Sequence, residues 1–143
     1  MYDILKSFHS HNRNLVLLLL VIAILLAIVG LVSKKTWSKF NKIFSLLGMI
    51  ITDIQFLIGM ILYFAFSPLG IKAFSNDNIN VMKDAVVRKI AVEHLVLMLA
   101  AWILIHIGYS KVKKSANPHK SILIYYGLGL VLILAGIPWG KLV

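Results

Sequence analysis

The chain has 143 residues, of which 60% are hydrophobic and only 14% charged, and its formal net charge is +10. A water-soluble domain usually carries about a quarter charged residues, and so apolar a surface would aggregate in water. The composition therefore excludes a soluble domain and predicts one membrane domain, residues 1–143, with the lipid bilayer as its solvent. Because the chain has no cysteine, disulfides, thiolate metal sites, cysteine-ligated iron–sulfur clusters and covalently attached c-type haem are excluded as well.

Four apolar stretches follow one another along the chain, each near the ~20 residues that cross the hydrocarbon layer. The expected transmembrane helices cover approximately 14–32, 43–66, 90–109 and 121–137. The first stretch lacks a signal-peptide cleavage pattern and ends at Ser33-Lys34-Lys35, so we expect a retained helix. Pro68 and Gly70 end the second stretch, and Pro138-Trp139-Gly140 closes the fourth at the membrane interface.

The connections between these stretches predict how the helices are arranged. Residues 33–42 and 110–120 are short, polar and basic, which favours two tight antiparallel hairpins. Residues 67–89 form a longer amphipathic link, and its end, 82–89, is expected to extend the third helix with Asp84 and Arg88 paired at i,i+4. The sequence thus predicts an all-α fold, an integral membrane four-helix bundle with antiparallel up-down-up-down topology.

Charge density predicts the orientation. The two short connections hold eight lysines and no acidic residue: Lys34, Lys35, Lys39, Lys42, Lys111, Lys113, Lys114 and Lys120. The other side holds seven basic residues spread over longer segments: Lys6, Arg13, Lys72, Lys83, Arg88, Lys89 and Lys141. The dense lysine loops are expected in the cytoplasm, with both termini on the outer side. Because these residues flank apolar runs, lipid headgroups rather than nucleic acid are their expected partners.

Small residues predict which faces turn inward, since they let membrane helices approach closely. On the first helix the stripe is Gly30, Ala27, Ala23, Leu20, Val16, Arg13 and His9, with His11 on the far side. On the second it is Gly48, Thr52, Gln55, Gly59 and Tyr63, with Asp53 at its border. On the third it is Ala91, His94, Met98, Ala101 and Gly108, and on the fourth Tyr125, Gly129, Leu132 and Gly136.

Ionisable residues inside the spans are candidates for function, because each costs roughly 2.5–3.5 kcal/mol to insert. His94 faces inward, where it could ligate haem iron or another metal, or form a hydrogen bond to a neighbouring helix. Asp53, near the midplane, could be protonated, could bond a hydroxyl or amide on another helix, or could take part in a proton relay. Glu93 is expected to pair with a nearby basic residue (Lys89, Arg13 or Arg88). We expect His106 at the interface and His119 solvated in its basic loop.

The sequence resembles the small four-helix bacterial membrane proteins commonly labelled cytochrome b-like. The resemblance runs over nearly the whole chain and is carried by His9-Ser10 followed by Arg13, Gln55-x-x-x-Gly59 running to Leu62-Tyr63-Phe64, Ala91-Val92-Glu93-His94, Ile107-Gly108-Tyr109-Ser110-Lys111 and Ala135-Gly136-Ile137-Pro138-Trp139. It implies a multi-pass protein of the bacterial inner membrane that holds haem b through histidines and transfers electrons within the membrane. Two positions depart from the family pattern: Asp53 replaces a usual histidine and Asn14 a usual tryptophan.

Combined with the inward His94, the resemblance suggests haem b ligated by His94, with His9 or His11 as the second ligand and Arg13 near the propionates. Counted from the cytoplasmic helix ends at ~1.5 Å per residue, His94 lies ~22 Å along its helix and His9 ~36 Å along its own. The expected height difference of ~14 Å strains a shared site unless the first helix is shifted, tilted or broken before Asn14. A haem with a single histidine ligand and a chain without haem are the alternatives.

The alternative is a non-catalytic accessory subunit, without cofactor, of a larger membrane complex. Such a complex is also the expected partner of an electron carrier. The sequence lacks an acid–base constellation, a phosphate loop or a nucleophile motif, so a soluble substrate and an enzymatic activity of its own are not expected.

Overall fold

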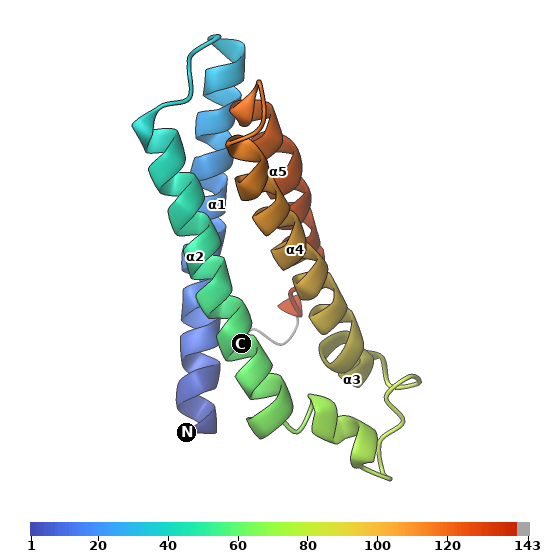
Figure 1. Cartoon of the computed structure of the whole chain (residues 1–143). Helices are drawn as coiled ribbons and strands as arrows, with labels where there is room; N and C mark the ends of the chain where they lie inside the picture. The colour runs from blue at the N-terminus through green and yellow to red at the C-terminus, as the bar shows by residue number, and fades with distance from the viewer. Residues whose placement is uncertain (140–143) are drawn as a thin grey trace.

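The computed structural model describes residues 1–139, which are helical and contain no strand (Figure 1). The helices in chain order are α1 (Tyr2–Val32), α2 (Lys39–Ile61), η1 (Leu62–Phe66), η2 (Ile71–Ser75), α3 (Ala85–Arg88), η3 (Lys89–His94), α4 (Leu95–Val112) and α5 (Pro118–Gly136). Segments η1 and η3 are π-helical and η2 is a 3₁₀ helix. Gly140 and Lys141, assigned above to the outer end of the fourth helix, lie outside the described residues.

Four helical stretches are long and apolar enough to cross a membrane: Tyr2–Val32, Lys39–Ser75 (with a turn at 67–70), Ala85–Val112 and Pro118–Gly136. Consecutive stretches run in opposite directions, as the chain colours in Figure 1 show. Helix α1 packs along α2 and α5, and α4 packs along α5 and α2. The two expected hairpins are therefore present, and α2 and α4 make the loosest of the four helix pairings.

Local capping explains where the helices begin. Ser38 starts α2 ahead of the expected residue 43, because its hydroxyl accepts a hydrogen bond from Asn41 N while the Asn41 side chain accepts one from Ser38 N. Asp84 caps α3 by accepting from Val86 N and Val87 N. The expected Asp84–Arg88 pair is wrong for this reason, and the Arg88 guanidinium donates instead to Met82 O.

Helix α1 begins at Tyr2, far ahead of the expected residue 14. The polar residues before residue 14 do not stop the helix, since His9 and Asn12 among them pack on and bond to α2. The added turns carry His9 into contact with α2, where its ring lies over Gly59.

The core confirms most of the expected inward stripes. Its fully buried apolar members are Val16, Leu20, Ala23, Ala27, Ala101, Ile105, Ile122, Tyr126, Ile133 and Ile137. The expected face of α5 was wrong in part, because Tyr126 and Ile133 are buried where Tyr125 and Leu132 were expected. Tyr126 takes this place because its hydroxyl donates to Ser45 O on α2 at 2.7 Å.

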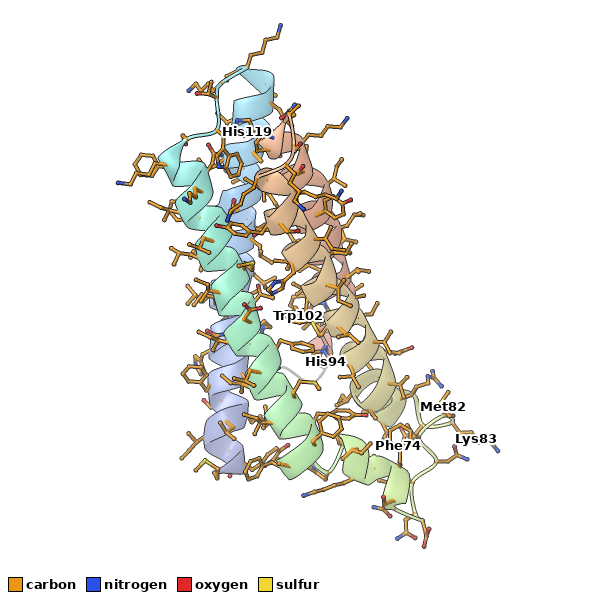
Figure 2. The ribbon with its side chains drawn as sticks, viewed as in Figure 1. Phe74, Met82, Lys83, His94, Trp102 and His119 are labelled. Atoms are coloured by element: carbon orange, nitrogen blue, oxygen red, sulfur yellow. The ribbon has the colours of Figure 1, made fainter. Side chains whose placement is uncertain are left out.

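The expectation of a solvated His119 is wrong. Its side chain is buried under the loop between α1 and α2, where Nε2 lies 2.9 Å from Lys35 O (Figure 2). The imidazole packs on Trp37 at 5.3 Å between ring centroids and lies directly against Gly30. His119 therefore fastens the start of α5 to the end of α1.

Candidate functional site

A cavity of about 300 Å³ lies between the helices in the half of the molecule that holds the N-terminus. All four membrane-length stretches contribute to its walls, which are mostly apolar. Its polar and aromatic lining includes Lys6, His9, Arg13, Gln55, Tyr63, His94 and Trp102. His94 and Trp102 lie on the inner side of the third stretch, toward α2 (Figure 2). The π-helical segments η1 and η3 both border this cavity, and such segments are frequent at functional sites.

His9 and His94 meet inside the cavity. Their ring centroids lie 6.3 Å apart with the ring planes at 79°. Nδ1 of His94 lies 2.9 Å from Gly136 O. Since a carbonyl only accepts, Nδ1 carries the proton, and Nε2 is the nitrogen with a free lone pair. Nδ1 of His9 is buried without a hydrogen-bond partner among residues 1–139.

The expected ~14 Å height difference between these histidines is wrong, because the first and third membrane stretches do not end at one level. Gly30 on α1 lies against His119, whereas Gly108 on α4 lies against Tyr125 and Tyr126. His119 and Tyr126 are about two turns apart, which sets Gly108 roughly 10 Å below Gly30. Counting down both helices from these levels places His9 and His94 at nearly the same depth, about 31 Å below Gly30.

A hydrogen-bonded chain between α1 and α2 fixes the position of His9. Gln55 Nε2 donates to His9 O at 2.8 Å, and Asn12 Nδ2 donates to Gln55 Oε1 at 2.9 Å. Gly59, one turn beyond Gln55, lies against the His9 ring. The inward stripe on α2 predicted that Gln55 and Gly59 face the interior, but Asn12 gave no such signal, since it lies outside the stripe on α1.

The other expected site residues lie in different places. Arg13 lines the cavity. His11 is exposed outside it, where Nδ1 lies 2.7 Å from Ser7 O on the same helix. Glu93 pairs with Arg88 at 3.9 Å, as expected, on the exposed side of η3.

A second polar cluster lies where α2 meets α4. Asp53 Oδ1 accepts from Trp102 Nε1 at 2.7 Å and lies 2.5 Å from His106 Nε2. The Trp102 ring stacks on Phe56 at 4.9 Å between centroids and an interplanar angle of 11°. His106 was expected at the interface, and its bond to Asp53 was missed. The sequence did hold a signal for this bond: Trp102 and His106 are four residues apart, so both side chains lie on one face of the helix.

Within residues 1–139 no three His, Asp or Glu side chains gather closely enough to hold a bare metal ion. Two imidazoles cannot form a closed zinc site, which takes four protein ligands. Haem iron is different, because the porphyrin supplies four nitrogens and the protein supplies only the axial ligands. The residues of the cavity therefore fit haem better than a bare metal ion.

Comparison with protein-family models, with curated proteins and with solved structures finds no match to this chain.

Proposed function

We propose that this chain is an integral membrane four-helix bundle that binds haem b between His9 and His94 and carries electrons within a bacterial inner membrane. The observation that carries the proposal is the meeting of two imidazoles, from different helices, in one cavity. Haem b would supply one-electron chemistry at its iron, and the residues of the chain would bind and orient it.

The separation of the two rings supports this proposal. When two imidazoles bind one metal from opposite sides with bonds of about 2 Å, their ring centroids are about 6 Å apart. His9 and His94 have a centroid separation of 6.3 Å. The angle between their planes does not oppose ligation, since each ring can rotate about its own metal bond.

The surroundings of each ring support the same proposal. A histidine that binds a metal commonly donates its other ring N–H to a carbonyl, and His94 does so toward Gly136 O. Nε2 of His9 has no hydrogen bond within residues 1–139 and is not buried, so this nitrogen is open to a ligand, whereas Nδ1 is enclosed by protein. Lys6 and Arg13 line the same cavity, and their charges suit the two carboxylates of haem b.

The membrane orientation proposed here has the lysine-rich connections in the cytoplasm and the N-terminus on the outer side. It rests on the density of lysines beside the ends of α1, α2, α4 and α5. The haem cavity then lies toward the outer half of the membrane, because it is in the half of the molecule that holds the N-terminus.

The test is an absorption spectrum of the purified protein, oxidised and then reduced, before and after reconstitution with haem b. We expect a Soret band and, on reduction, the sharp visible bands of a six-coordinate low-spin haem. A folded protein without a Soret band after reconstitution would overturn the proposal and favour the cofactor-free accessory subunit.

A further inference from the structure

The cluster between α2 and α4 is not needed to ligate haem, yet it places polar groups inside the apolar layer. We call it the seam and define it by Asp53, Phe56, Trp102 and His106. Intramembrane ionisable groups usually face a protein interior or a functional cavity. In the seam, however, the side chains of Asp53 and His106 remain 40% and 37% exposed. Whatever meets them must arrive from the membrane side of the α2–α4 pairing.

The hydrogen bonds of the seam leave two acceptors open. Oδ1 of Asp53 accepts from Trp102 Nε1 and from His106 Nε2, so Nδ1 is the nitrogen of His106 that keeps a free lone pair. Within residues 1–139 no hydrogen bond reaches Asp53 Oδ2 or His106 Nδ1, and neither atom is buried. The seam therefore selects a ligand that donates hydrogen bonds.

An aromatic wall stands beside these acceptors. The stacked rings of Phe56 and Trp102 come from the two helices of the seam, and Trp102 also donates to Asp53. Both aromatic residues line the cavity that holds His9 and His94. Because Trp102 already contacts Phe56 and has the His106 ring 4.8 Å from its own, a flat ring that enters from the membrane side would lie against Phe56, beside the acceptors. Offset stacking on such a wall is favourable for an aromatic ligand.

We propose that the seam binds a membrane-soluble hydroquinone, with its phenolic hydroxyls donating to Asp53 Oδ2 and His106 Nδ1. This class of molecule combines the three features that the seam requires, namely solubility in lipid, an aromatic ring and hydroxyl donors. The oxidised quinone carries carbonyl acceptors instead, so it lacks the donors and binds more weakly.

The electron step rests on the proposed function. Oxidation of the hydroquinone to the quinone releases two electrons and two protons. Ferric haem b, where bound, would accept these electrons singly, so each hydroquinone would need two equivalents of ferric haem b. The two protons go to His106 Nδ1 and Asp53 Oδ2, the acceptors of the two phenolic hydroxyls. Binding itself needs no haem, so the two proposals can fail separately.

The experiment uses haem-free full-length protein in lipid nanodiscs, with Trp37→Phe and Trp139→Phe so that Trp102 is the only tryptophan and can be excited selectively. Quenching of Trp102 is titrated with decylubiquinol and, separately, with decylubiquinone. We expect the reduced probe to bind about tenfold more tightly, as one hydrogen bond to a charged group would give. Equal affinities for the two probes would overturn the proposal. So would quenching of Trp102 that is no stronger than the quenching of Trp139 in a control protein with Trp37→Phe and Trp102→Phe.

Asp53→Asn sharpens this test, because the amide keeps Oδ1 for Trp102 and His106 but replaces the acceptor Oδ2 with a donor. We expect weaker binding of decylubiquinol and tighter binding of decylubiquinone. His106→Phe removes the second acceptor, should weaken only the reduced probe, and provides the test if Asp53→Asn does not fold. Asp77→Asn, in the outer loop, is the matched control. Unchanged preference in both seam variants would contradict the proposal.

The redox step has its own readout in haem-loaded protein. Asp53→Asn should slow haem reduction by decylubiquinol at least tenfold and leave reduction by dithionite unchanged. An unchanged rate with decylubiquinol would exclude the seam as the site of oxidation. If the chain binds no haem at all, the proposed function fails while the binding result in haem-free protein still decides the seam.

Discussion

The imidazole of His9, near the start of α1, lies 6.3 Å from that of His94, at the end of η3, and the two planes meet at 79°. Each ring is held from a different direction. Gln55 on α2 holds His9 by donating a hydrogen bond to its backbone carbonyl. The His94 ring is held by the hydrogen bond that it donates to Gly136 O, at the end of α5. All four long helices are therefore needed to bring the two rings together.

Removing either ring should abolish six-coordinate haem. In His9→Ala and in His94→Ala the iron keeps one protein ligand, so the spectrum should change from low-spin to high-spin and haem affinity should fall at least tenfold. His11→Ala is the matched control, because this histidine is exposed and bonds only within its own helix. His9→Ala could instead keep a low-spin spectrum that is lost only when His11→Ala is added. That result would assign the second ligand to His11.

Gly59→Ala should displace the His9 ring without removing it. A Cβ at Gly59 would stand 3.0 Å from Cε1 of His9, closer than ordinary van der Waals contact. We expect weaker haem binding and a shifted reduction potential in a protein that still folds. Gly127→Ala is the control, since no atom lies within 4 Å of its added Cβ. Identical haem affinity in the two variants would show that Gly59 does not set the place of the ring.

The helices and their faces could be read from the sequence because both follow local rules. Apolar length marked the four stretches, and small residues marked the buried sides of α1, α2 and α4, such as Ala23 and Ala101. The predicted face of α5 was wrong in part, since that helix is apolar nearly all round. Only the hydrogen bond of Tyr126 to Ser45 O determines which of two adjacent tyrosines turns inward.

The relative depth of the helices could not be read from the sequence. The expected heights required the apolar runs to end at one level, but the packing of Gly30 on His119 sets α1 about two turns higher than α4. That offset is a tertiary property, and it reverses the conclusion about His9 and His94. The bond between Asp53 and His106 was missed for the same reason, since pairing across helices depends on their offset.

Tyr126→Phe should destabilise the fold while leaving the cavity intact. The hydroxyl is buried and donates to Ser45 O at 2.7 Å, and a typical hydrogen bond contributes about 1 kcal/mol to stability. We expect a lower free energy of unfolding in detergent, measured by circular dichroism during denaturation. Tyr125→Phe should change it by less, because this side chain is only half-buried and its hydroxyl has no hydrogen bond within residues 1–139. Equal losses would contradict the assignment.

The membrane orientation can be tested with single cysteines, because the chain has none of its own. In intact bacterial cells a membrane-impermeant maleimide should label Asp77→Cys, in the outer loop, and should not label Lys34→Cys or Lys114→Cys. Breaking the membrane should expose the latter two. The opposite pattern would reverse the orientation, and labelling of all three in intact cells would contradict the antiparallel topology.

Gly30 and His119 should be coupled in stability. A Cβ at Gly30 would overlap the imidazole of His119, so Gly30→Ala should cost about 1–3 kcal/mol, the usual cost of overpacking. His119→Ala should also destabilise, since it removes the contact with Trp37 and the hydrogen bond to Lys35 O. In the double variant the overlap no longer exists, and its loss should be smaller than the sum of the single losses by about 1 kcal/mol or more. Thermal unfolding of the four proteins measures this difference, with Gly127→Ala as a control that should be additive with His119→Ala. Strict additivity of Gly30→Ala and His119→Ala would mean that the two residues do not touch, and the depth of α1 against α5 would then have to be revised.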